Sequence, residues 1–100
     1  MKILALEREL PEADAGKFAP LLEAEARRVW ELTQSDELRD VYFRADRSDA
    51  VLVLECAGVE QAQDLLASLP LVAAGLIEFE LIPLAPYPGF GRLFSRPDVQ

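Results

Sequence analysis

Apolar residues recur along this chain at two spacings, one typical of strands and one typical of helices. The first segment with strand spacing, KILALER, is closed by charge and then by Pro11. The last, LIEFELI, alternates strictly, so one face of that strand is apolar and the other carries Glu78 and Glu80. The four predicted strands cover residues 2–8, 37–45, 51–56 and 76–82.

Two further segments have helical spacing. Asp14 is suited to cap a helix that runs to about Gln34, and Pro20 inside this stretch predicts a kink or a restarted helix. Gly58 can cap a second helix, which Pro70 stops. The apolar stripe of this second helix consists of Val59, Ala62, Leu66 and Leu69.

The predicted order is strand, helix, strand, strand, helix, strand, which is the ferredoxin-like βαββαβ arrangement. The fold class is therefore α+β, with one domain over residues 1–83, an antiparallel sheet and two helices on one face of it. Val51 and Val53 lie opposite Leu52 and Leu54 on one strand, so the second sheet face is also apolar. Large apolar patches are unusual on soluble monomers, and we predict a symmetric homodimer that packs sheet against sheet.

Residues 84–100 form a Pro-rich and aromatic C-terminal extension. Pro86 and Pro88 disfavour a helix in this segment. Its apolar side chains are those of Tyr87, Phe90, Leu93 and Phe94. We predict that the extension packs on a partner subunit. The alternatives are a frayed terminus and a Pro-rich ligand for another domain.

Charge and cysteine content narrow the class of protein. The net charge is −8 with only 10 Lys and Arg, so this surface would repel a phosphate backbone, and we expect no nucleic-acid partner. No segment reaches the roughly 20 apolar residues that span a bilayer, and the N-terminal apolar run is too short for a signal peptide. Cys56 has no partner for an intramolecular disulfide, which fits a reducing cytoplasm. We therefore expect a cytoplasmic protein with no membrane partner.

Histidine is absent from the chain. This absence excludes haem held by a proximal histidine and zinc sites built from histidine. Any acid or base in a reaction must then be Asp, Glu, Lys, Tyr or Cys, with a pKa set by its surroundings.

Glu25 lies in the middle of an otherwise apolar helix face, in the stretch LLEAEARRVWEL. Burial of an ionised carboxylate is unfavourable, so the pKa of Glu25 should rise toward the useful range for a general base. Alternatively, Glu25 forms a buried pair with an arginine from the sheet, or the helix rotates enough for Glu25 to reach water.

Several segments together resemble muconolactone isomerase and its relatives. They are the helix around Glu25, the strands RDVYFRAD and AVLVLEC, the Val59 helix, and the segment LPL followed by IEFE. The resemblance runs from about residue 14 to residue 86 and implies a dimeric α+β barrel, with a small pocket between the first helix and the sheet. It also implies proton movement on an unsaturated lactone without a cofactor, and possible assembly into a higher homo-oligomer.

The resemblance also suggests roles for single residues. It implies that Glu25 is a candidate proton carrier, and Arg39 matches an arginine of the isomerase. Arg39 would hold a substrate carboxylate or a developing enolate; the alternative is a pair with Asp36 or Asp40. Tyr42 stands where we would expect tryptophan. It is a candidate ligand-binding residue, or else a core aromatic.

Other candidate residues have simpler interpretations. Glu7 and Glu55 each end a strand with a charge, and we expect both to be solvated. Glu78 and Glu80 are close enough to bind a cation, but no third ligand is evident, so we predict an exposed face or interface salt bridges and no metal site. Cys56 has no histidine to activate it and is expected to be a small core residue.

The sequence thus favours a homodimeric, cofactor-free isomerase that moves a proton on a small lactone or carbonyl compound. In this hypothesis Glu25 removes and returns the proton, and Arg39 stabilises the negative charge in between. The alternative is a non-catalytic module for small-molecule binding or oligomeric assembly, in which Glu25 is structural and the C-terminal extension matters most.

Overall fold

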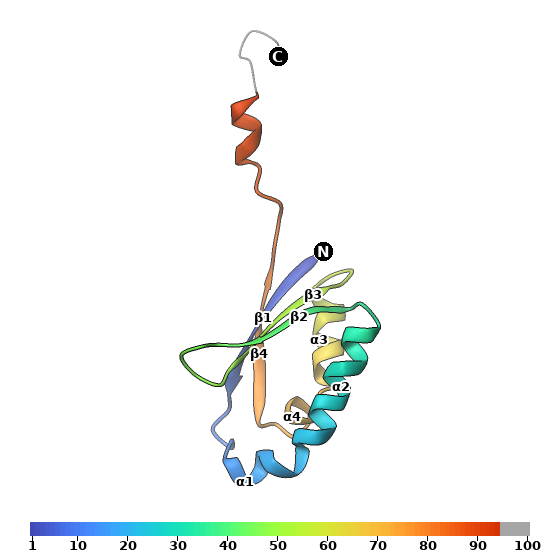
Figure 1. The fold of residues 1–100 in the computed structure, drawn as a ribbon, viewed down its shortest axis with the longest axis vertical. Coiled ribbons are helices and arrows are strands. Elements are labelled where there is room, and N and C mark those ends of the chain that lie inside the picture. Colours follow the sequence, from blue (N-terminus) through green and yellow to red (C-terminus); the bar gives the residue numbers. More distant parts are fainter. Residues whose placement is uncertain (95–100) are drawn as a thin grey trace.

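A computed structural model describes residues 1–94 of the chain as one four-stranded sheet with helices packed on it (Figure 1). The strands are β1 (Lys2–Glu9), β2 (Leu38–Phe43), β3 (Ala50–Glu55) and β4 (Ile77–Pro83). The α-helices are α1 (Ala15–Phe18), α2 (Leu22–Gln34), α3 (Val59–Ala67) and α4 (Pro70–Ala73). Two 3-10 helices, η1 (Ala19–Leu21) and η2 (Gly89–Leu93), complete the described elements.

The sheet is antiparallel throughout, in the order β2-β3-β1-β4. This is the strand order that the ferredoxin-like arrangement requires, so the predicted α+β class and topology are confirmed. In the register, Ala5 of β1 lies between Leu52 of β3 and Leu81 of β4. Side chains alternate across a strand, so this register assigns every strand residue to one of two faces.

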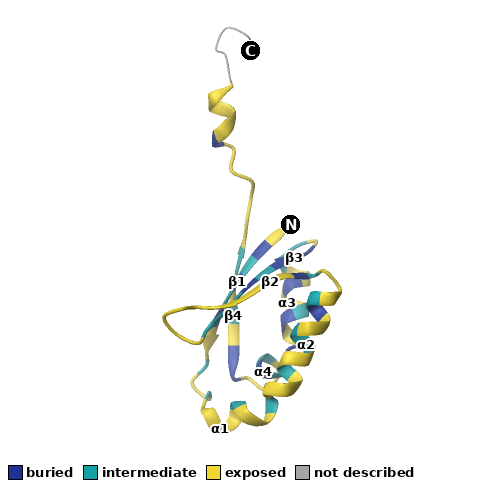
Figure 2. Ribbon diagram, in the orientation of Figure 1, coloured by how far each residue is buried: buried dark blue, intermediate teal, exposed yellow. Residues whose placement is uncertain are grey.

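Helices α2 and α3 both cover the same face of the sheet, which we call the inner face (Figures 1 and 2). The main core lies between them and the strands, and Ile3, Leu54 and Ala62 in it are completely buried. A smaller cluster forms where α4 meets β4, around Leu71 and Ile77. The inner face of β4 carries the predicted apolar set Ile77, Phe79 and Leu81.

The segment before α2 breaks where its proline predicts a break. Asp14 caps α1, because its side chain accepts a hydrogen bond from the Lys17 N–H at 2.9 Å. Pro20 then stands at the start of a 3-10 turn, and the α-helix restarts at Leu22. The predicted cap and the predicted break near Pro20 are both confirmed.

The connection between α3 and β4 contains the short helix α4, which the sequence pattern did not predict. Pro70 ends the preceding helix as expected but also occupies the first position of α4, where its missing N–H costs nothing. The turn after α4 closes through Gly75, whose φ of +74° favours glycine. A hydrogen bond of 3.1 Å from the Leu76 N–H to the Leu71 carbonyl completes it.

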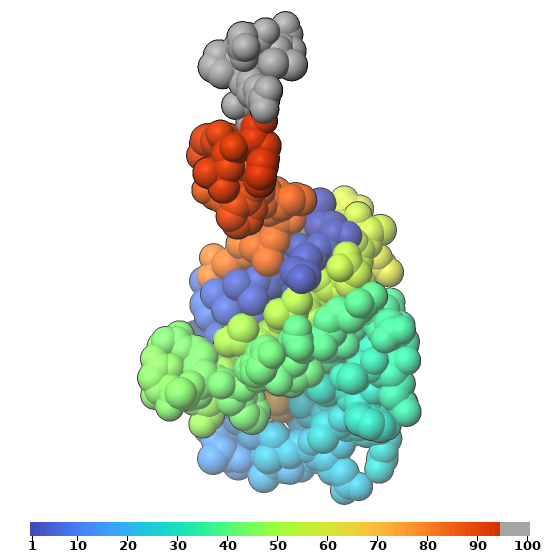
Figure 3. All heavy atoms as spheres, turned by 45° about the horizontal axis from the view of Figure 1, so that its top comes forward, coloured from blue at the N-terminus to red at the C-terminus, as the bar shows by residue number. Residues whose placement is uncertain are grey.

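No helix of residues 1–94 covers the second face of the sheet, and the four strands lie side by side at the surface there (Figure 3). This outer face bears the half-buried apolar side chains of Leu4, Leu6, Val51, Val53 and Ile82. Among the described residues, no helix is long and apolar enough to span a membrane.

The chain leaves the domain after β4 and continues away from it as an extension (Figures 1 and 3). The extension lengthens the molecule to 65 Å, against 29 Å and 21 Å in the other two directions. Its apolar side chains are largely exposed, with Phe90 at 65% and Phe94 at 81% (Figure 2). Tyr87 and Phe90 stack edge to face with ring centres 5.0 Å apart. The last part of the predicted segment 84–100, residues 95–100, lies outside the described residues.

Candidate functional site

A cavity of about 310 Å³ opens between α2, α4 and the inner face of the sheet. Its only polar lining side chains are those of Glu7 and Glu25. The remaining lining residues are apolar: Leu22, Ala26, Val29, Val41, Phe43, Ala50, Leu52, Leu69, Leu71 and Phe79. A site of this kind, apolar with a few convergent polar groups, suits a small organic molecule.

Glu25 projects from α2 into this cavity and is half-buried. Its Oε1 accepts a hydrogen bond of 2.9 Å from the backbone N–H of Leu71, at the start of α4. Burial raises the pKa of the Glu25 carboxyl, and the hydrogen bond from Leu71 offsets part of that rise. The carboxylate is thus held by one backbone donor, with its proton affinity above that of a glutamate in water.

Glu7 is the second carboxylate of the cavity, and it comes from strand β1 of the sheet, whereas Glu25 comes from helix α2. It follows Ile3 and Ala5 on the inner face of β1 and is 9% exposed. Its Oε1 accepts a hydrogen bond of 3.0 Å from the Ala50 N–H. The expectation that Glu7 is solvated is therefore wrong, because the strand continues for two residues beyond it and keeps its side chain under the helices.

The charge of Glu25 acts on the second carboxylate, Glu7. Burial is the main cause of the raised pKa of Glu7, and the charges of Asp49, Glu9 and Glu25 raise it further. Like charges in a cavity of low dielectric disfavour double ionisation, so a proton is held more readily on one of the two groups. Such a pair can accept a proton from a bound molecule and donate one to it without a metal or a cofactor.

Arg39 does not line this cavity within one chain. It sits at the irregularity of β2 between Leu38 and Asp40, is exposed, and its Nε donates a hydrogen bond of 2.6 Å to the Asp36 carbonyl. Its positive charge acts on Glu55, at the end of the neighbouring strand β3. The structure thus does not bring Arg39 together with Glu25.

Tyr42 lies on the outer face of β2, opposite Val51, whereas its neighbours Val41 and Phe43 face the cavity. It is 57% exposed, and its hydroxyl donates a hydrogen bond of 3.4 Å to Asp40. In a single chain Tyr42 therefore belongs neither to the core nor to the cavity.

The outward carboxylates of β4 are exposed, and Glu78 lies 3.6 Å from the Arg8 guanidinium. Within residues 1–94, no three Asp, Glu, Cys or His side chains gather in a way that could hold a metal ion. Cys56 is buried, and this burial raises the pKa of its thiol.

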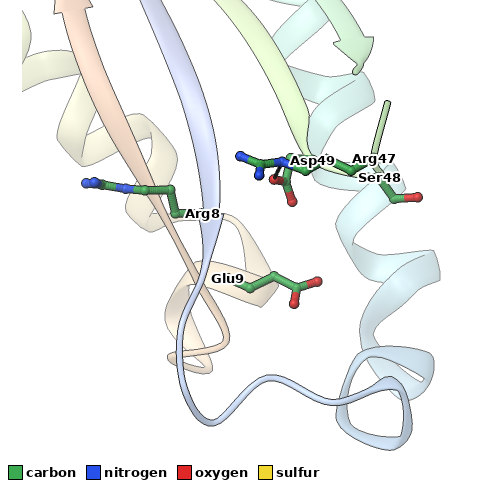
Figure 4. Close-up of a pocket in the computed structure, with 5 residues that line it drawn as sticks. All are labelled: Arg8, Glu9, Arg47, Ser48 and Asp49. Atoms are coloured by element: carbon green, nitrogen blue, oxygen red, sulfur yellow. Dashed lines mark ion pairs between the residues drawn. The ribbon is translucent and has the colours of Figure 1, made fainter. Parts of the chain in front are cut away.

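A polar hollow lies at the end of the sheet near Glu7, between the end of β1 and the loop before β3 (Figure 4). Arg47 and Asp49 form an ion pair of 2.6 Å in it, and Arg8 and Glu9 extend in opposite directions from β1. A third hollow, of about 430 Å³, shares Glu9 with this polar hollow and shares Glu7 and Phe43 with the cavity. The three hollows are therefore adjacent, and the polar one borders a path toward the carboxylates.

Solved structures with this fold can now be compared. No protein-family model and no curated protein sequence matches the chain. A crystal structure of muconolactone isomerase superposes with a TM-score of 0.72 over 88% of this chain and 92% of that one, at 23% sequence identity. The dehydrochlorinase of 5-chloro-2-hydroxyhydroquinone from Burkholderia phenoliruptrix, in complex with 2,5-dihydroxybenzoquinone, superposes with a TM-score of 0.67 over 89% of this chain and 98% of that one, at 12% identity.

The chain therefore has the α+β fold of muconolactone isomerase, and the predicted resemblance is confirmed for the fold. Identities this low carry no information about a shared reaction, which has to be argued from the residues of the cavity itself.

Proposed function

We propose that this protein is a cofactor-free isomerase that moves a proton on a small lactone or carbonyl compound. The observation that carries the proposal is a half-buried carboxylate, Glu25, held by the Leu71 N–H at the wall of an apolar cavity. Burial raises its pKa toward the pH at which a general base works best.

The reaction needs only one mobile proton. The ionised Glu25 carboxylate removes a proton from the carbon next to the carbonyl of a β,γ-unsaturated lactone, and the electron pair of that C–H bond moves into a dienolate. The protonated Glu25 then returns the proton to the γ carbon, which gives the α,β-unsaturated isomer and regenerates the carboxylate. No electrons leave the substrate, so no redox partner is required.

Glu7 supports this chemistry as a second carboxylate in the same cavity, with a pKa that burial and the charge of Glu25 both raise. Arg39 and Tyr42 lie outside the cavity of one chain, so in this proposal each would reach a site only from another subunit. The solved structures of this fold named above include an isomerase and a dehydrochlorinase, and the latter holds a small ring compound.

The test is isomerisation of a simple butenolide, α-angelica lactone, followed by the absorbance of its conjugated isomer. We expect Glu25→Gln to lower the rate by about 100-fold or more, the usual contribution of a general base. Glu23→Gln is the matched control, because Glu23 lies on the same helix with its side chain 88% exposed. A wild-type rate in Glu25→Gln, or no catalysis by the wild type of this or any other small unsaturated lactone, would contradict the proposal.

A second candidate function, assembly through the C-terminal extension, is favoured by the exposed aromatic residues of that extension. Tyr87, Phe90 and Phe94 expose large apolar surfaces at the end of a segment that points away from its own domain. We propose that this segment packs on a second copy of the chain, in a cytoplasmic homodimer or higher homo-oligomer, because exposed apolar surface of this kind is typical of interfaces.

Deletion of residues 84–100 tests this second proposal. Light scattering should give a lower mass for the truncated chain than for the full chain at equal concentration. An unchanged mass would contradict an assembly role for the extension. Retained butenolide turnover in a dissociated truncated chain would separate assembly from catalysis.

A further inference from the structure

The charged residues that line the cavity are both acidic. Glu7 and Glu25 are the charged residues of its lining, and neither lysine nor arginine belongs to it. The adjoining hollow adds Glu9 and Asp14, again without a basic side chain. A negatively charged ligand placed here would meet two carboxylates and no counter-charge among the lining residues.

Arg47 and Arg28 are both engaged by acidic side chains. Arg47, at the polar hollow, pairs with Asp49 at 2.6 Å, and Asp49 is itself among the groups whose charge acts on Glu7. Arg28 of α2 binds Ser68 at 2.8 Å and Glu31 at 3.2 Å. Neither arginine lines the cavity, so neither supplies a direct counter-charge to a ligand inside it.

The apolar walls of the cavity add to the cost of binding an anion. Leu22, Val41 and Phe43 line the cavity and are 52%, 45% and 73% exposed, which makes its margin apolar. An anion that passed this margin would lose its hydration without gaining an equivalent set of hydrogen-bond donors. An uncharged ring would bury apolar surface against the same residues.

We infer that the Glu7–Glu25 cavity selects small, uncharged, apolar-bodied molecules over carboxylates of the same shape. This inference deepens the proposed function, on whose site it rests, by assigning the charge class of its ligand. Each carboxylate uses one oxygen for a backbone N–H, at Ala50 and at Leu71, and its second oxygen is the acceptor for the hydroxyl or amide of a ligand.

Two pairs of probes with matched shapes test the inference by binding alone. Benzamide and benzoate differ in charge, and phenol and fluorobenzene differ in the hydrogen-bond donor. Binding is followed at pH 7.5 by protein NMR, from the shifts of the Ala50 and Leu71 amides that contact the two carboxylates. We expect benzamide to bind at least about tenfold more tightly than benzoate, and phenol more tightly than fluorobenzene.

The Glu7→Gln/Glu25→Gln double variant removes both charges and keeps both side-chain shapes. In it the preference for benzamide should fall to within about threefold, because the repulsion of benzoate is gone. If the double variant does not fold, the wild-type comparison still decides the matter.

Benzoate binding as tight as benzamide binding in the wild type would overturn the inference, as would no shift with any probe at millimolar concentration. Its failure is distinguishable from failure of the proposed function. A protein that has no isomerase activity but prefers benzamide over benzoate would support the inference and contradict the proposed function. Turnover of a lactone that carries a carboxylate would support the proposed function and contradict the inference.

Discussion

Glu25 of α2 accepts a hydrogen bond of 2.9 Å from the backbone N–H of Leu71, 46 residues further along the chain. The bond joins the long helix to the short helix α4 and fixes one carboxylate oxygen at the cavity wall. Because the donor is a backbone group, the position of the carboxylate depends on the fold of the α3–β4 connection as much as on its own helix. The structural role of Glu25 can therefore be tested through this hydrogen bond, independently of any catalysis.

Amide hydrogen exchange at Leu71 should report this link. In Glu25→Ala the Leu71 N–H loses its acceptor, and its protection factor should fall at least about tenfold, because a hydrogen bond to a charged group contributes about 1.5–3 kcal/mol. Glu25→Gln retains an acceptor oxygen and should keep most of the protection. The Ala50 amide, which Glu7 binds, is the internal control and should exchange as in the wild type. Equal protection of Leu71 in all three proteins would show that the bond is not formed in solution.

The raised pKa values of Glu7 and Glu25 predict a particular pH dependence of stability. The folded state binds these protons more tightly than the unfolded state, in which the carboxyls titrate near 4.5. The stability that they contribute is therefore fully present below that value and is lost as the pH rises through the folded-state pKa values. The Glu7→Gln/Glu25→Gln variant lacks this loss. Its unfolding free energy should therefore increase relative to that of the wild type as the pH rises from 4 to 7.5.

Denaturant unfolding of both proteins across that range measures the difference in unfolding free energy. Carboxyl-carbon NMR titration of Glu7 and Glu25 gives the two pKa values directly, as apparent values of a coupled pair. Parallel stability curves, together with titration of both groups in the ordinary range of glutamate, would contradict burial as the cause of the shifts.

The N-terminal cap of α1 should contribute measurably to stability. Asp14→Ala removes the acceptor for the Lys17 N–H and should lower the unfolding free energy by about 0.5–2 kcal/mol. Asp14→Asn keeps a capping oxygen and is the matched control, with a loss of a few tenths of a kcal/mol at most. Equal stability of the two variants would mean that the cap is not formed in solution.

The core of the sheet and the margin of the cavity should differ in their sensitivity to truncation. Leu54 is completely buried on β3, and Leu54→Ala should cost about 2–5 kcal/mol of unfolding free energy. Leu22 is 52% exposed, and the same change there should cost under about 1 kcal/mol, because half of its surface is already in water. Urea unfolding compares the two. Similar losses would indicate that Leu22 is covered in solution, by a ligand or by another chain.

Local patterns in the sequence account for most of the fold. Asp14 and Pro20 fix the start and the break of the first helical segment through their own backbone chemistry, with no need for tertiary information. The strict alternation of Ile77, Phe79 and Leu81 assigns β4 to the inner face in the same way. The short helix α4 was not predictable, since four residues are too few to give a periodic signal.

Of the two carboxylates in the cavity, the sequence pattern predicted only Glu25. Glu25 stands out because it interrupts an apolar helix face, whereas Glu7 looks like the charged end of a strand. The available signal was its phase, because Glu7 shares a strand face with Ile3 and Ala5. What the sequence could not reveal is that β1 stays paired with β4 at Glu7 and beyond it, as far as Glu9 opposite Ile77. The position of Arg39 depends in turn on the irregularity in β2, which no spacing predicts.

The most direct measurement of the central claim is hydrogen exchange at the carbon next to the carbonyl of a butenolide in deuterium oxide, followed by proton NMR. The signal of that hydrogen is lost whether deuterium from the solvent returns to the same carbon or the double bond moves, so the measurement does not depend on complete turnover or on the choice of natural substrate. The account predicts that the wild type accelerates loss of that hydrogen signal, that Glu23→Gln does the same, and that Glu25→Gln is slower by about 100-fold or more. Equal exchange with the wild type and with Glu25→Gln would contradict the assignment of Glu25 as the proton carrier.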